Sequence, residues 1–270
     1  MTDPFTPIVV VGTGEARAEV RAHGAHVTSW RTANGDEQLY LSARSAFHDG
    51  AAIRGGVPIV FPQFSSFGPL PKHGFARTRT WDVAGPGTFV LRDDDRTRAV
   101  WPHAFRLELA VTVDDARLTV ALTVDNTGDA PFAFSAALHT YLRVRDVEAI
   151  AIDGLAGLRY RDSAHGGTEH VQPEGALAIA GEVDRIYLDV PGPVTVREPG
   201  RAVTVRASGF SDVVVWNPGA ALAATIADLD PDGWRHFVCI EAAAIATPIQ
   251  LAPGERWTGR GEWGQTPFSG

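Results

Sequence analysis

The chain has 270 residues, 44% of them apolar, which is enough to bury a sizeable core without disulfides or a structural metal. Its formal charge is -8, from 24 Lys and Arg against 32 Asp and Glu. Nucleic acid and acidic membranes are therefore excluded as expected partners, because both need a net basic surface. One β-sandwich can reach this length, so we expect a single domain over residues 1–270 and a monomer.

The start of the chain argues against export. Residues 1–7 are acidic and precede only a short apolar run at residues 8–11, unlike the basic segment and long apolar stretch of a signal peptide. We find no stretch long enough to span a bilayer. The single cysteine, Cys239, cannot form an internal disulfide, which agrees with a reducing compartment. We expect a cytoplasmic protein.

Short apolar or alternating runs recur along the chain and predict β-strands. They are rich in Val, Ile, Phe and Trp, are separated by Gly, Pro, Asn and Asp, and lie at residues 8–11, 57–61, 107–113, 118–124, 203–207, 213–216 and 237–241. The third and fourth runs alternate across a tight turn at Asp114-Asp115, which predicts an antiparallel hairpin with one solvated face. No run shows a helical pattern with convincing caps, and residues 220–232 suit a longer loop. The sequence predicts an all-β fold, a large sandwich of antiparallel sheets.

Several cofactor motifs are absent. The segment VVVGTGEAR imitates a dinucleotide-binding loop through Gly12 and Gly14, but Arg17 stands where the third glycine belongs and no βαβ pattern follows. Nucleophile-elbow and zinc-protease signatures are missing, and no histidine pair has a convincing ligand spacing. We expect neither a metal nor a nucleotide cofactor.

Residues 53–81 have an unusual composition, with paired glycines and four prolines. Composition alone favours a long surface loop with solvated arginines around a buried Phe cluster. The functional alternative is a binding-site wall that offers guanidinium groups to an anion such as a phosphate. The polar side chains of this segment are Arg54, Gln63, Lys72, His73, Arg77 and Arg79.

Two ionisable residues lie in apolar runs. His139 follows FSAAL, and Glu241 ends the run FVCIE. A lone histidine among apolar residues is usually a satisfied core residue, and a lone buried glutamate usually belongs to an ion pair. A carboxylate in an apolar strand costs several kcal/mol unless it is paired or functional, so Glu241 is the stronger candidate for a functional role.

The segments RGGVPIVFPQF, PKHGFARTRTW, LHTYLRV, EVDRIY, VVVWNPG and VCIEAA follow one another in this order. Their combination resembles the hexose-6-phosphate mutarotases, also called glucose-6-phosphate 1-epimerases, of the aldose 1-epimerase superfamily. The resemblance covers nearly the whole chain and implies a galactose-mutarotase-like sandwich. Lys72 departs from the pattern, because relatives commonly carry Gln before the His-Gly pair.

Anomer interconversion requires a base at the C1 hydroxyl and an acid at the ring oxygen, and no cofactor. The resemblance implies His139 as the acid and Glu241 as the base. It implies a small sugar phosphate as the partner, with Arg54 and Arg77 at its phosphate. It further implies substrate contacts from His73, Asp184 and Gln63. Two other functions stay open: a free galactose or glucose 1-epimerase without the phosphate clamp, and a carbohydrate-binding module without catalysis.

Overall fold

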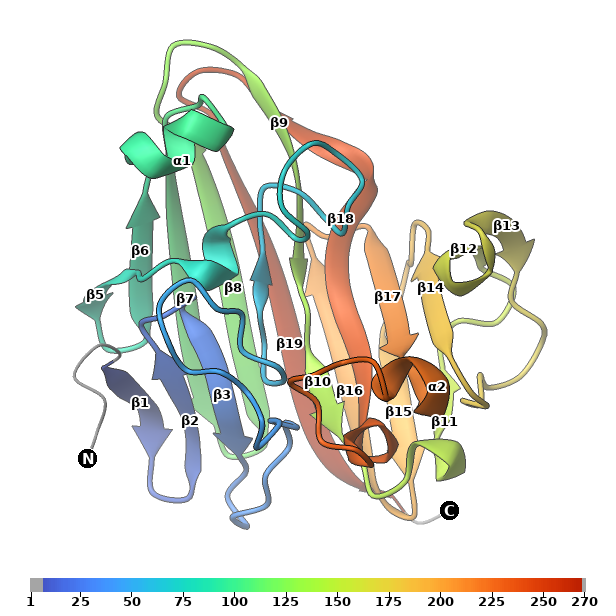
Figure 1. Cartoon of the computed structure of the whole chain (residues 1–270). Coiled ribbons are helices and arrows are strands. Elements are labelled where there is room, and N and C mark those ends of the chain that lie inside the picture. The colour runs from blue at the N-terminus through green and yellow to red at the C-terminus, as the bar shows by residue number, and fades with distance from the viewer. Residues whose placement is uncertain (1–6, 269–270) are drawn as a thin grey trace.

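The structure is a computed structural model that describes residues 7–268, so most of the chain start considered above lies outside the described residues. Two large antiparallel sheets and one small sheet form the body of the molecule (Figure 1). The prediction of an all-β antiparallel sandwich is therefore confirmed. No described helix is long and apolar enough to cross a membrane.

One large sheet, here called the site sheet, has the order β13-β12-β14-β17-β18-β9-β4, with β10 also paired to β18. Its strands are antiparallel, and β18 is the longest of them. Their bounds are β4 (Ile59–Val60), β9 (Phe132–Leu138), β10 (Tyr141–Arg143), β12 (Arg159–Asp162), β13 (Thr168–Val171), β14 (Val183–Tyr187), β17 (Asp212–Asn217) and β18 (Phe237–Leu251).

The other large sheet has the order β11-β15-β16-β19-β8-β7-β6-β5. Its strands are β5 (Asp82–Gly85), β6 (Thr88–Arg92), β7 (Phe105–Asp114), β8 (Arg117–Asn126), β11 (Ala151–Asp153), β15 (Val194–Glu198), β16 (Gly200–Ser208) and β19 (Arg256–Phe268). The small sheet contains β1 (Ile8–Thr13), β2 (Ala16–Arg21) and β3 (His26–Arg31), in that order. Figure 1 shows it beside β7 at the N-terminal end of the molecule.

The helical elements are short. They are α1 (Asp95–Val100), α2 (Gly219–Ala223) and the 3₁₀ turns η1 (Ala76–Thr78), η2 (Val147–Ala149), η3 (Ser163–His165) and η4 (Gly233–His236). The sequence reading missed α1, because six residues are too few for a helical period. Its start is nevertheless encoded by a capping box, in which the Asp94 side chain accepts from the Thr97 N–H at 2.7 Å. The loop expected at 220–232 begins with α2.

Alternation along the strands separates two apolar regions. Ile240 and Ala242 point into the main core shared by the sheets, whereas Glu241 and Ala243 point to the opposite face of the site sheet. A second buried cluster covers part of that opposite face, with Val60, Phe64, Ala137, Ile186, Leu188, Val214, Ala243 and Ile245 as its members. Polar groups on this face are therefore held outside the main core.

Three sequence expectations need adjustment. The run at 57–61 forms a strand over two residues only, Ile59–Val60. The hairpin of β7 and β8 is present with an alternating burial pattern, but Asp114 pairs with Arg117, so the turn lies at Asp115-Ala116 and not at the expected Asp114-Asp115. Glu241 does not end its strand, because β18 continues to Leu251. Its position in the middle of a paired strand fixes its backbone more firmly than a strand end would.

Candidate active site

A break in the site sheet brings His139 to Glu241. Strands β9 and β10 both pair with β18, but the regular register is interrupted at His139 and Thr140, where only the Thr140 carbonyl still accepts from β18, from the Ile240 N–H at 3.1 Å. The Thr140 backbone and hydroxyl both donate to the Leu138 carbonyl, at 2.9 and 3.2 Å, and hold this turn. The His139 Nε2 atom lies 3.3 Å from Glu241 Oε1. Irregular pairing therefore aims the imidazole at the carboxyl group.

Glu241 is the more deeply buried partner, with 1% of its surface exposed. Its Oε2 atom has no hydrogen-bond partner among the described residues. Burial raises the pKa of Glu241 well above its usual value, Asp184 raises it further, and Arg77 opposes the shift. Burial therefore favours the protonated form of this carboxyl group over the ionised form.

His139 is 7% exposed and is enclosed by aromatic rings. Tyr141 stacks on its imidazole at 5.0 Å between ring centroids, and Trp216 meets it edge-on at 5.9 Å. Its Nδ1 atom is without a hydrogen-bond partner in the part of the chain that the structure describes. Burial lowers the pKa of His139 well below its usual value, and the positive charges of Arg77 and Arg54 lower it further.

The two shifts favour a neutral pair, with the proton on Glu241 and the imidazole uncharged. Moving that proton to His139 would create the charged pair without changing the total number of protons. The neutral and the charged pair differ only in whether Glu241 Oε1 or His139 Nε2, 3.3 Å apart, carries the proton. The pair can therefore deliver a proton to one atom of a ligand and take one from another atom.

Arg54 precedes the glycine pair and reaches the same face of the sheet. Its guanidinium donates to the Tyr141 hydroxyl and to Asp228 Oδ1, each at 3.1 Å. Tyr141 and Asp228 contribute to a raised pKa of Arg54, against the effect of burial. The side chain is thus a permanently charged, oriented donor.

Arg77 is the middle residue of η1 and belongs to the same segment, residues 53–81, as Arg54. It donates to the Lys72 carbonyl at 3.0 Å, while its buried Nε atom lacks a partner within residues 7–268. Burial lowers the pKa of Arg77, and the positive charge of Arg54 adds to that effect. An anion placed between the two guanidinium groups would relieve their repulsion and provide an acceptor for the free donor.

The segment HGAH at residues 23–26 packs against the backbone next to Arg54 and against the backbone of Arg77. His26 Nε2 contacts the Gly55 carbonyl at 2.7 Å, next to Arg54 in the chain. Gly24 adopts a φ of +72°, and a Cβ there would lie 2.7 Å from the Arg77 carbonyl oxygen. Glycine is required because the backbone approaches so closely.

His73 lies beside the catalytic candidates on a strained backbone. Its ring centroid is 5.4 Å from that of His139, and its φ of +65° is unusual for a residue with a Cβ. The ring Nδ1 accepts from the Ser65 N–H at 3.2 Å, while the His73 N–H donates to the Ser65 carbonyl at 2.9 Å. This acceptor role leaves the proton on Nε2, where it can be donated.

Gln63 is buried under the same loop. Its amide donates to the carbonyls of Ser65 and Leu70 at 3.0 and 3.1 Å, and its carbonyl accepts from the Leu70 N–H at 2.9 Å. These three bonds use both amide hydrogens, so Gln63 holds the loop in this structure. The segment crosses β9 (Figure 1), where the Phe64 N–H donates to Ser135 Oγ at 2.7 Å.

Asp184 projects from β14 onto the face that carries Glu241, opposite Trp216 in the neighbouring strand. Burial raises the pKa of Asp184 to about 6, with Lys72 opposing the shift. Lys72 is exposed. The departure from the family pattern therefore places a cation near an acceptor on the rim of the site.

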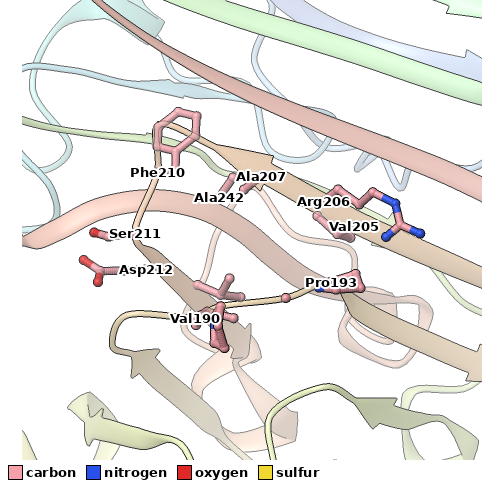
Figure 2. A pocket seen from close by; sticks show the side chains of 12 residues that line it. Val190, Pro193, Val205, Arg206, Ala207, Phe210, Ser211, Asp212 and Ala242 are labelled. Carbon is pink, nitrogen blue, oxygen red and sulfur yellow. The ribbon is translucent and has the colours of Figure 1, made fainter.

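A separate hollow of about 220 Å³ lies among the 190–193 loop, β16 and the start of β17 (Figure 2). It contains none of the residues predicted for the site. The Asp212 carboxylate there accepts from the N–H groups of Ile245 and Ala246, each at 2.8 Å, at an irregularity in β18. Asp212 thus has a structural role.

Six of the predicted site residues lie in one region: His139, Glu241, Arg54, Arg77, His73 and Asp184. Phe61 and Phe75, from the Phe cluster expected in residues 53–81, belong to the main core. Sequence reasoning missed Tyr141 and Asp228. Tyr141 could have been found, because it follows His139 by two residues and so shares its face of an extended chain. Asp228 follows α2 in an irregular segment and had no such signal.

A buried imidazole–carboxyl pair on one face of a β-sandwich, with hydrogen-bond donors around it, is the arrangement expected of an enzyme that moves protons on a small polar substrate. A model of the family described as aldose 1-epimerase matches residues 7–263. The chain belongs to the aldose 1-epimerase family and is an isomerase.

Relatives and solved structures agree. A curated relative from Cenchrus ciliaris is 34% identical over 94% of this chain and 82% of its own length, and one from Escherichia coli (strain K12) is 34% identical over 87% and 82%. Both are provisionally named glucose-6-phosphate 1-epimerase. A solved structure of a provisionally named mutarotase from Salmonella typhimurium matches with a TM-score of 0.89 and 29% identity, over 97% of this chain and 91% of that one.

Proposed function

We propose that this protein interconverts the α and β anomers of a hexose 6-phosphate. The main support for the proposal is the position of the His139–Glu241 pair, which lies close enough to Arg54 and Arg77 for their charges to affect the pKa of His139. The pair supplies proton transfer, and the arginines supply a site for a dianion in a protein whose net charge is -8. The provisional names of the relatives point to the same substrate.

Ring opening begins with the charged form of the pair. Glu241 removes the proton of the C1 hydroxyl while His139 protonates the ring oxygen, which breaks the C1–O5 bond and leaves a neutral pair beside the open-chain aldehyde. Rotation about C1–C2 presents the other face of the carbonyl. The two protons then return, the O5 proton to His139 and the Glu241 proton to the carbonyl oxygen, as O5 attacks C1. Each positioned group contributes about 10²- to 10⁴-fold.

The phosphate does more than anchor the substrate in this proposal. Burial lowers the pKa of His139, and the charges of Arg77 and Arg54 lower it further. A dianion bound between the arginines offsets their field, so the pKa of His139 rises when the substrate binds. The imidazole thereby becomes a better proton donor in the complex than in the free protein.

The remaining polar residues orient the sugar. Asp184 accepts from hydroxyl groups, and His73 donates from Nε2, the nitrogen left free by its bond with Ser65. Gln63 acts on the substrate through the loop whose backbone it holds. Trp216 offers a half-buried ring to the C–H edge of the sugar. We place the protein in the cytoplasm, in agreement with its single cysteine.

The decisive experiment measures anomer exchange by NMR on glucose 6-phosphate and free glucose in parallel. We expect faster enzyme-dependent exchange of the phosphorylated sugar. A preference for free glucose would replace the proposal with a free-hexose 1-epimerase. Binding of either sugar without any exchange above the spontaneous rate would indicate a carbohydrate-binding module instead.

A further inference from the structure

Cys239 lies beside the acid–base pair but has no role in proton transfer. It precedes Glu241 by two residues in β18, so the two side chains share one face of the site sheet. One donor atom each from His139, Cys239 and Glu241 lie within 4.8 Å of one another, and all three residues are buried. Burial raises the pKa of the Cys239 thiol well above its usual value.

We propose that His139, Cys239 and Glu241 form a binding site for a thiophilic divalent cation such as zinc, and that the bound cation inhibits the enzyme. Imidazole, thiolate and carboxylate are the ligand types that zinc takes in proteins. Tetrahedral ligands at about 2.0 and 2.3 Å from zinc lie roughly 3.5 Å apart. The Nε2–Oε1 separation of 3.3 Å already matches this spacing, and the thiol, which lies within 4.8 Å of a donor atom of each of the other two residues, must move closer to complete the set.

A second observation points to a ligand. Glu241 Oε2 is buried without a hydrogen-bond partner among the described residues, so no competing hydrogen bond occupies this oxygen, and His139 presents Nε2 to the same carboxyl group. Arg54 and Arg77 oppose a cation, but a thiolate and a carboxylate offset their two charges. Binding releases the thiol proton to solvent, together with the Glu241 proton when that carboxyl group is protonated.

Inhibition follows from the atoms involved, and this half of the inference rests on the proposed function. The lone pairs that would bind zinc on His139 and Glu241 are those that exchange protons with the sugar. A bound cation removes both from proton transfer. The enzyme thus needs no metal for activity and is sensitive to one at its reacting centre.

Cobalt(II) titration tests binding without reference to activity. Chelator-treated wild-type protein should develop thiolate-to-cobalt charge-transfer absorption that saturates at one equivalent and disappears when zinc is added. The chain has one cysteine, so this absorption reports on Cys239 alone. Cys239→Ala and the more nearly isosteric Cys239→Ser should abolish it. Absence of the absorption in the wild type would overturn the proposal.

Zinc affinity gives the second readout. Cys239→Ala, His139→Asn and Glu241→Gln should each weaken zinc binding at least about tenfold, because losing a ligand should cost no less than losing a residue that supports one. His165→Asn is the matched control, since the exposed imidazole of His165 contacts the buried carboxylate of Asp162 at 3.0 Å, outside the site. It should retain wild-type affinity. Equal affinity in wild type and Cys239→Ala would place the metal elsewhere.

Zinc should inhibit anomer exchange by the wild type and at least about tenfold more weakly in Cys239→Ala, and chelator should restore the rate. Equal inhibition of both proteins would overturn the inhibitory role. A wild-type protein that binds cobalt through Cys239 but exchanges no sugar anomers without metal would contradict the proposed function and leave the metal site standing.

Discussion

At the scale of single residues, the acid–base pair depends on burial as much as on residue type. His139 and Glu241 lie in apolar surroundings that push both toward their neutral forms. A solvated pair at the same distance would have pKa values near those of free side chains and little reason to share a proton. In the proposed function, the aromatic rings around His139 therefore contribute to proton transfer by excluding water from the imidazole.

Removing either partner should stop exchange without unfolding the protein. Glu241→Gln and His139→Asn each keep approximate shape but lose the proton-transfer group. We expect losses of roughly 10²-fold or more in anomer exchange if chemistry limits the rate. NMR exchange rates measure the loss, and circular dichroism checks the fold. Near-normal exchange by folded Glu241→Gln would require a different base.

The two arginines should distinguish phosphorylated from free sugar. Arg54→Ala and Arg77→Ala each remove a charge-assisted donor, which should cost about 1.5 to 3 kcal/mol, or roughly tenfold to over a hundredfold in kcat/KM for glucose 6-phosphate. Free glucose should lose much less. Arg79→Ala is the control, because Arg79 pairs with Asp94 outside the site. Equal losses on both sugars would mean that the arginines hold the ring or the loop.

Asp184 should show a trade between function and stability. Its pKa of about 6 exceeds the ordinary 3.8, so the folded state binds more protons than the unfolded state between these values. The contribution of Asp184 to stability is therefore full at low pH and is lost as pH rises toward 6 and above, by up to about 3 kcal/mol. Asp184→Asn should raise Tm at pH 7, raise it less at pH 4, and weaken sugar binding. An unchanged Tm difference between the two pH values would contradict the shift.

At the scale of elements, the strands were predictable and the irregular segments were not. Alternation of apolar and polar residues located β7, β8 and β16, because burial of one face imposes a period of two, whereas a continuous apolar run located β17. The sequence also nominated His139 and Glu241 as unusual residues in apolar runs. Their contact depends on the break between β9 and β10, which is a tertiary feature without a local signal. The bonds of Gln63 likewise depend on how its loop closes.

The segment at 23–26 should make the site sensitive to acid. Burial lowers the pKa of His26 to about 3, and the charges of His23, Arg77 and Arg21 add to the effect. The unfolded state therefore binds more protons between pH 6.5 and 3. Stability from His26 is full above pH 6.5 and falls with pH below it, by about 2 kcal/mol at pH 5.

The test compares Tm at pH 7 and pH 5 for wild type and His26→Asn. The variant should be less stable at pH 7, because the bond to Gly55 is lost or weakened, and should lose less on acidification than the wild type. A parallel pH dependence in the two proteins would show that other groups cause the acid sensitivity.

At the scale of the whole molecule, the single-domain and monomer predictions remain predictions. The net charge of -8 indicates how the proposed sugar phosphate would have to be bound, because a protein of this charge cannot attract a dianion by its net field. Local cations must do so at short range. Only the folded chain shows that Arg54 and Arg77, which lie 23 positions apart in the sequence, affect each other electrostatically.

The proposed reaction needs only side chains, so activity should survive exhaustive chelation and require no added nucleotide. Anomer exchange by protein dialysed against excess chelator measures this, with untreated protein as the control. We expect an unchanged or higher rate, the latter where adventitious zinc occupied the site. Loss of activity that a divalent metal restores would contradict the mechanism.

The candidate site residues lie on two kinds of element, a paired strand and connecting segments, and this arrangement affects which substitutions the fold can accept. Glu241 is fixed in the longest strand of the site sheet, whereas Arg54, His73 and Arg77 lie in connecting segments. In the proposed function, substitutions in those connecting segments would change which sugar is accepted and leave the strand that holds Glu241 unaltered. His139 lies at the break between β9 and β10, so only the proposed base is held by the sheet itself, and the substrate range can vary with the surrounding segments.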